Sequence, residues 1–110
     1  MKLPEVIVIT QDKLLRYLLL PQEENDKSRF LASAGYTLAN WELLEHNLRQ
    51  FAETYEVSDR EISPYGVKYE VHGTLNGPNG RMLHVVTVWI TLEATGETRF
   101  VTLFPRREAN

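Results

Sequence analysis

The sequence predicts an α+β fold in which three N-terminal helices pack on one face of an antiparallel meander of three strands, or of four. Two observations predict this fold: apolar residues recur at helical spacing in the first half, and apolar and polar residues alternate in the second. At 110 residues and 43% hydrophobic content, the chain has the size and apolar surface of one domain. We expect a single domain, with a helical half over residues 1–57 and a sheet over residues 62–105.

Three segments of the first half carry helix signals. The first begins after Thr10, a residue suited to an N-cap, and ends before Pro21. The second covers residues 27–34 and ends at Gly35, where a helix often needs a left-handed residue. The third has the clearest helical period. Its apolar stripe consists of Trp41, Leu44, Leu48, Phe51, Ala52 and Tyr55.

Turn-rich segments divide the second half into three strands. A turn at residues 63–66 precedes an alternating run, and residues 76–80 are dense in Asn, Gly and Pro. A further turn covers residues 94–97. The predicted strands cover residues 67–75, 82–93 and 98–104.

The two hairpin turns predict a register, and the register predicts two faces. Centring the turns on residues 78–79 and 95–96 places Val71 opposite Val86, and His84 is expected to point toward the core. The core face then collects Val67, Tyr69, Val71, Leu75, Met82, Val86, Val88, Ile90, Leu92, Val101 and Leu103. The outer face collects Lys68, Glu70, His72, Thr74, Val85, Thr87, Trp89, Thr91, Phe100, Thr102 and Phe104. We expect the helices on the first face and any chemistry on the second.

A candidate catalytic group stands on the outer face. Glu70 and His72 alternate on one strand, so their side chains point to the same side. Lys68 precedes them, and the register places Thr87 and Trp89 across from this row. A carboxylate and an imidazole can act as general base and acid, a lysine can stabilise a phosphorane-like charge, and an indole can stack a base. The group therefore fits a metal-independent ribonuclease that acts on RNA. The alternatives are a solvated polar face and a partner-binding surface.

Three aromatic side chains on the outer face predict that something covers it. Trp89, Phe100 and Phe104 would otherwise be exposed in a two-layer domain of this size. The cover is either the N-terminal run Val6 to Ile9 or another protein chain. The second candidate function is therefore a non-enzymatic interaction module, for instance a homodimer, that uses this face.

The composition argues against several classes of cofactor and partner. The chain has no cysteine, and its three histidines lack partners at metal-ligand spacing, so we expect no metal and no other cofactor. A net charge of −3 disfavours nucleic-acid binding by the overall field but permits a local basic site. The apolar runs are too short to span a membrane and the N-terminus has no export signal, so we expect no membrane contact and a cytoplasmic location.

Short elements along nearly the whole chain carry a family resemblance. They are Lys13-Leu14, Tyr17-Leu18-Leu19, Lys27, Phe30, Gly35-Tyr36, Pro64-Tyr65-Gly66, Tyr69, Val71, Gly73, Leu75, Pro78, Gly80-Arg81, Val86-Thr87-Val88-Trp89, Val101-Thr102 and Pro105. In order and spacing they resemble the bacterial domain of unknown function 6883. The family usually has a His-Pro-x-Gly segment where this chain has residues 21–25, so the resemblance implies no role for that loop.

The resemblance implies a toxin-like domain. Such domains look like C-terminal modules of bacterial toxin and phage-type proteins, and their layout is similar to that of barnase and RelE-like ribonuclease toxins. A layout alone does not establish a function. The resemblance implies a small antitoxin-like protein as partner. It also implies that five residues matching the family's motifs belong to the site, namely Lys27, Arg81, Thr87, Trp89 and Thr102.

Overall fold

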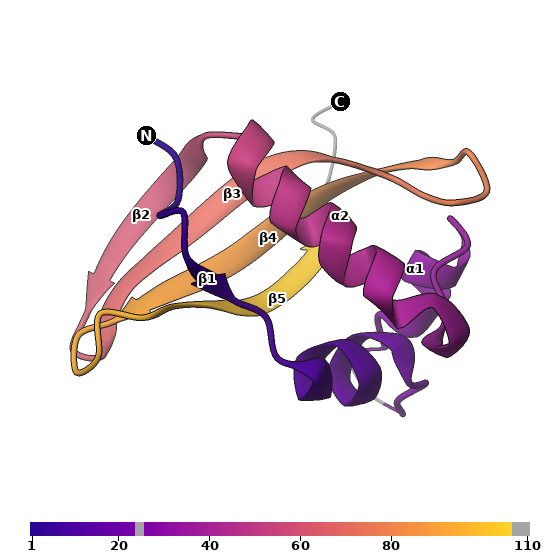
Figure 1. The fold of residues 1–110 in the computed structure, drawn as a ribbon, viewed down its shortest axis with the longest axis horizontal. Coiled ribbons are helices and arrows are strands. Elements are labelled where there is room, and N and C mark those ends of the chain that lie inside the picture. The colour runs from indigo at the N-terminus through magenta and orange to yellow at the C-terminus, as the bar shows by residue number, and fades with distance from the viewer. Residues whose placement is uncertain (24–25, 107–110) are drawn as a thin grey trace.

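The sheet of this protein has five strands. In the computed structural model, which describes residues 1–23 and 26–106, they form one mixed sheet in the order β1-β5-β4-β3-β2 (Figure 1). β1 runs parallel to β5, and the other neighbours are antiparallel. The strands are β1 (Ile7–Val8), β2 (Val57–Ser63), β3 (Gly66–Asn76), β4 (Met82–Leu92) and β5 (Thr98–Pro105).

One long helix covers the sheet. The helices are the π-helix η1 (Lys13–Leu19), α1 (Ser28–Ala32), the 3₁₀ turn η2 (Leu38–Asn40) and α2 (Trp41–Thr54). Thr37 and Asn40 cap the start of η2, where the Thr37 N–H donates to Asn40 Oδ1 at 2.7 Å. α2 buries Leu44, Leu48 and Phe51 in the core and crosses one face of the sheet (Figure 1). None of the described helices is long and apolar enough to cross a membrane.

The predicted arrangement of three helices on a three- or four-stranded antiparallel meander is wrong. The sheet has five strands, one pairing is parallel, and α2 is the only long helix within residues 1–23 and 26–106. The sequence pattern does not predict β2, because five of its seven residues are exposed and the strand shows no alternation of apolar and polar residues. A short, charged edge strand needs no apolar face of its own. The β-prone run Val6 to Ile9 supplies β1, the other edge.

The predicted register is wrong by one residue at the first hairpin. Val71 of β3 pairs with Thr87 of β4, not with Val86. Because side chains alternate along a strand, this shift turns β4 over relative to the expectation. The three predicted strands themselves are confirmed as β3, β4 and β5, within one residue at each end.

Two local features cause the difference in register. The loop between β3 and β4 covers residues 77–81 and closes with the Gly77 N–H donating to the Arg81 carbonyl oxygen at 2.9 Å. The loop has five residues, so the hairpin is centred on Asn79. The predicted centre lies between residues 78 and 79, and this half-residue displacement shifts every strand pair by one residue. β5 also carries a bulge between Phe100 and Thr102.

α2 and the N-terminal segment lie on one face of the sheet, called here the covered face (Figure 1). Its buried side chains on β3 to β5 are Tyr69, Val71, Leu75, Leu83, Val85, Thr87, Trp89, Thr98, Phe100 and Leu103. The opposite face, called the open face, carries Lys68, Glu70, His72, Thr74, His84, Val86, Val88, Ile90, Leu92, Arg99, Thr102 and Phe104. Five residues predicted for the core face are therefore not on the covered face, namely Met82, Val86, Val88, Ile90 and Leu92.

Two of the three aromatic rings expected on the outer face belong to the core. Trp89 and Phe100 meet edge to face, with ring centroids 5.2 Å apart, and both are buried on the covered face. Phe104 alone of the three lies on the open face, opposite Val86. The expected three-ring interaction surface therefore does not form.

The N-terminal segment completes the covered face. It passes in front of that face in Figure 1 and buries Leu3, Ile7 and Ile9 in the core. The Met1 carbonyl oxygen accepts the Val57 N–H at 2.7 Å, which ties the segment to β2. The segment therefore does not cover the open face.

The loop that sets the register of β4 is held by the helical half of the chain. The Asn79 N–H donates to the Ala34 carbonyl oxygen at 3.2 Å, and its side-chain amide donates to the Ser33 carbonyl oxygen at 3.1 Å. Gly77 lies so close to Ala34 that any side chain at this position would collide with the Ala34 carbonyl oxygen. The loop conformation and the helix connection therefore depend on each other.

Thr87 joins the strand pairing to the core. Its hydroxyl donates to the Val71 carbonyl oxygen at 3.1 Å and accepts the indole N–H of Trp89 at 2.8 Å. All three residues are buried, so no water can replace either bond.

We expect Thr87→Val to destabilise the protein although it keeps the side-chain volume. The change leaves the Trp89 indole N–H buried without a partner, at a cost of about 1–3 kcal/mol, whereas the Val71 carbonyl oxygen keeps its strand-pairing bond from the backbone of residue 87. Thr74→Val on the open face is the matched control and should change the free energy of unfolding by less than about 0.5 kcal/mol. Urea unfolding measures both, and equal stabilities of the two variants would contradict the buried hydroxyl network.

The register predicts opposite outcomes for lysine on the two sides of β4. Val85→Lys places an ammonium in the core without a partner, which should cost several kcal/mol and unfold the domain. Ile90→Lys can extend its stem over the open face with its charge in water, and should cost about 1–2 kcal/mol. Thermal denaturation compares the variants, and the reverse order of stability would indicate that β4 has the other register.

Candidate functional site

The open face holds a carboxylate and an imidazole in contact. His72 Nε2 and Glu70 Oε1 are 3.4 Å apart on β3, and the two side chains are 30% and 37% exposed. The His72 backbone N–H donates to Ser58 Oγ of β2 at 3.1 Å, which holds this part of β3 against the edge strand. The pair is therefore both positioned and accessible.

A second imidazole lies beside this pair because of the register that the sequence pattern missed. His84, expected in the core, is on the open face, and its Nδ1 is 3.2 Å from Thr74 Oγ1. His72 pairs with Val86, so His84 is its diagonal neighbour on β4. Diagonal neighbours on one face are about 7–8 Å apart, which leaves room for a phosphate group between two rings. Only the correct turn length could have revealed His84 from the sequence.

The other flank of the open face is formed by β5 and η1. Thr102 Oγ1 donates to the Tyr17 hydroxyl at 3.2 Å, so η1 reaches around the edge of the sheet. The Lys13 ammonium lies 4.6 Å from the centroid of the Tyr17 ring. Arg99 Nε donates to Glu97 Oε1 at 2.9 Å. Lys13 and Arg99 therefore both border this flank.

Charges of opposite sign occupy opposite flanks of the open face. The carboxylates of Asp59 and Glu61 belong to β2, and their residues pair with Glu70 and Lys68 of β3. Lys13, Arg99 and Arg106 border the β5 flank. The Arg106 backbone N–H donates to the His84 carbonyl oxygen at 2.8 Å, so the backbone of Arg106 lies beside that of His84 at the end of β4. A local basic flank thus exists in a chain of net charge −3.

The structure brings together only part of the predicted site. Lys68, Glu70, His72, Thr102 and Phe104 share the open face. Thr87, Trp89 and Phe100 are buried on the covered face, so their predicted place beside Glu70 and His72 is wrong. Arg81 is exposed in the loop after β3, and Lys27 directly precedes α1.

The groups with a clearly shifted pKa serve the scaffold. The hydroxyl and the N–H of Ser28 donate to Asp26 Oδ1 at 2.6 and 3.0 Å and lower the pKa of this carboxyl. Burial raises the pKa of Tyr36, against the opposing effect of the Asn47 amide that donates to its hydroxyl at 2.7 Å. The Tyr36 hydroxyl donates in turn to the Asn76 carbonyl oxygen at 3.0 Å, so it anchors the end of β3. In the part of the chain that the structure describes, no three His, Asp or Glu side chains group as metal ligands would.

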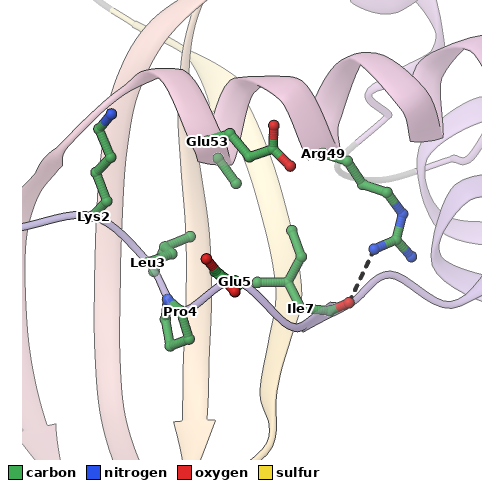
Figure 2. Close-up of a pocket in the computed structure, with 8 residues that line it drawn as sticks. Lys2, Leu3, Pro4, Glu5, Ile7, Arg49 and Glu53 are labelled. Carbon is green, nitrogen blue, oxygen red and sulfur yellow. Dashed lines mark hydrogen bonds between the residues drawn. The ribbon is translucent and has the colours of Figure 1, made fainter.

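Another hollow lies on the covered face of the molecule. It lies between the N-terminal segment and α2 (Figure 2). Its volume is about 510 Å³. Arg49 spans its end and donates from Nη1 to the Ile7 carbonyl oxygen at 3.0 Å. Lys2 and Arg49 are balanced by Glu5 and Glu53 around the same hollow, so its charge selects neither an anion nor a cation. It is remote from the imidazoles of the open face.

Comparison with solved structures supports the fold. One chain of a contact-dependent growth inhibition toxin–immunity protein complex from Klebsiella pneumoniae 342 superimposes with a TM-score of 0.70 and 16% sequence identity. The match covers 90% of this chain and 99% of that chain. At this identity the likeness concerns the fold alone.

Comparison with known sequences identifies the family. None of the curated proteins matches this sequence. The family model described as domain of unknown function (DUF6883) matches residues 2–107, which is nearly the whole chain and confirms the family resemblance. The chain therefore belongs to the DUF6883 family.

Proposed function

We propose that this domain is a toxin-type ribonuclease that cleaves RNA on the open face with its own side chains as acid and base. The observation that carries the proposal is the Glu70–His72 pair beside the second imidazole of His84 on an accessible sheet face. The fold likeness to a chain of a toxin–immunity complex supports a toxin-like role. By the same likeness, we propose an immunity-type protein as the partner that would block this face.

In the proposed reaction, His72 is the general base and His84 is the general acid. With Nε2 of His72 directed to Glu70, Nδ1 is the nitrogen that takes the proton from a ribose 2′-hydroxyl. The 2′-oxygen then bonds to phosphorus, the bond from phosphorus to the 5′-oxygen breaks, and a 2′,3′-cyclic phosphate forms. Protonated His84 gives its Nε2 proton to the leaving 5′-oxygen, while Thr74 holds its Nδ1. Lys68 lies on the same face four residues before His72, roughly 13 Å along β3, so it adds positive charge for the incoming RNA strand and does not contact the reacting phosphate.

The alternative of a non-enzymatic interaction module loses its main support. That proposal depended on three aromatic rings presented together, and Trp89 and Phe100 are core residues. The apolar strip that remains on the open face consists of β4 residues, and Val86 and Val88 are already buried among their neighbours. The open face therefore offers polar chemistry more than an apolar docking surface.

We expect the purified protein to cleave total RNA in the presence of a chelator and to leave 2′,3′-cyclic phosphate ends. His72→Ala and His84→Ala should each lower the rate about 10²–10⁴-fold, because each removes one proton-transfer step. Glu70→Gln should have a smaller effect, since it keeps the side-chain volume and removes only the charge that orients His72. Gel assays and mass spectrometry of the product ends measure these outcomes.

His46→Ala is the matched control, since His46 is the one histidine of the chain outside the proposed site and is exposed on α2. It should cleave at the wild-type rate. If His72→Ala and His84→Ala cleave as fast as His46→Ala, the proposed acid and base are wrong. If wild type cleaves no RNA under these conditions, the ribonuclease proposal itself is wrong.

A further inference from the structure

A small hollow at the η1 end of the open face has a cationic rim and an apolar floor. It has a volume of about 240 Å³ and lies between β1, β4, β5 and the start of η1. The lining residues are Val8, Thr10, Lys13, Ile90, Leu92, Arg99, Phe100 and Val101. We propose that this hollow binds one nucleotide of the RNA strand, with the base on the apolar floor and a phosphate at Lys13 and Arg99. The proposal deepens the proposed function and depends on it for the choice of RNA.

The register places this hollow on the same face as the two imidazoles. Ile90 and Leu92 alternate with the buried Trp89, so both belong to the open face. Arg99 pairs with Ile90 on one side and with Val8 of β1 on the other. The hollow therefore opens on the surface that carries His72, although it is formed by different strands.

The size and chemistry of the floor fit a single base. Val8, Ile90, Leu92 and Val101 present aliphatic side chains from three strands. A volume of about 240 Å³ is below the roughly 300–1,000 Å³ of sites for drug-sized ligands, and so suits one ring system. Contact of a base with this floor removes apolar surface from water without reading the sequence of the RNA.

The rim selects an anion. Lys13 and Arg99 are the only charged residues that line the hollow within the described ranges, and Glu97, which is bonded to Arg99, is not part of the lining. Glu97 engages Nε of Arg99, which leaves the two terminal guanidinium nitrogens available to a phosphate. The Lys13 ammonium rests on the Tyr17 ring, and no described carboxylate forms an ion pair with it. By contrast, the larger hollow of Figure 2 has balanced charges.

Tyr17 links the hollow to the candidate catalytic row. Its ring carries Lys13, and its hydroxyl accepts a hydrogen bond from Thr102. Thr102 pairs with Val88, which pairs with Glu70, so the three form one row across the open face. Ile90 of the hollow is four residues from Val86, the partner of His72, and six residues from His84. At about 3.3 Å per residue, the hollow lies roughly 13–20 Å along the strands from the imidazoles. It would therefore bind a nucleotide further along the RNA strand, not the reacting phosphate.

The test measures binding separately from cleavage. Uridine 5′-monophosphate, uridine and inorganic phosphate are each titrated into labelled wild-type protein, and backbone chemical shifts are followed by NMR. We expect the nucleotide to shift the signals of Val8, Ile90 and Val101 and to bind at least tenfold more tightly than either fragment. Lys13→Ala and Arg99→Ala should each weaken nucleotide binding about tenfold, the effect of losing one charge-assisted hydrogen bond.

Charge-matched controls exclude a general field effect. Lys2→Ala at the hollow of Figure 2 and Arg60→Ala on β2 should bind the nucleotide as wild type does. Equal binding by Lys13→Ala, Arg99→Ala and these controls would overturn the proposed site, as would inorganic phosphate binding as tightly as the nucleotide. An absence of nucleotide binding by wild type would overturn it as well.

Cleavage kinetics distinguish this inference from the proposed function. In a ribonuclease, Lys13→Ala should raise KM about tenfold with little change in kcat, whereas His72→Ala lowers kcat. Nucleotide binding at the hollow without any RNA cleavage would retain the site and reject the ribonuclease. Cleavage with an unchanged KM in both rim variants would retain the ribonuclease and reject the site.

Discussion

The register of β4 is the constraint on which the rest of the structure depends. It is fixed at one end by the loop after β3, where Asn79 is bonded to the backbone of the helical half and Gly77 leaves no room for a side chain. It is fixed in the middle by Thr87, whose hydroxyl satisfies a strand carbonyl and the Trp89 indole together. A shift of one residue would break both sets of bonds at once and would place the indole on the open face.

This constraint also decides where chemistry can occur. With Trp89 under the helix, the alternate residues of β4 form an aliphatic strip on the open face that ends in His84. The same register of β4 puts Thr74 within hydrogen-bonding distance of the His84 imidazole. The core and the candidate site are therefore two consequences of one pairing. The register that buries the Trp89 indole against Thr87 also places His84 on the open face, where it is the second imidazole near Glu70 and His72.

The fold and the site could be predicted from the sequence only where the side-chain pattern differs between the two faces. β3 alternates clearly, so the common face of Lys68, Glu70 and His72 follows from spacing alone. β4 is apolar on both faces, so its orientation depends on loop length, which dense turn residues leave ambiguous. β2 is polar almost throughout, and a hydrogen-bonded edge strand of this kind has no hydrophobic signal. The placement of Lys13 at the open face depends on tertiary packing of η1, which local sequence does not contain.

The net charge of −3 conceals an asymmetry that matters for any anionic partner. Asp59, Glu61 and Glu70 place carboxylates on β2 and β3, with Lys68 among them. Lys13, Arg99 and Arg106 border β5 and η1, with Glu97 bonded to Arg99, so the β5 flank of the open face is the more positive one. A polyanion would be repelled from one flank and held at the other, with its backbone between the two. Such a face can orient a nucleic acid strand toward the imidazoles without a large overall positive charge. The total charge of a small domain is therefore a weaker guide to its ligand than the distribution of charge over the one face that the core leaves accessible.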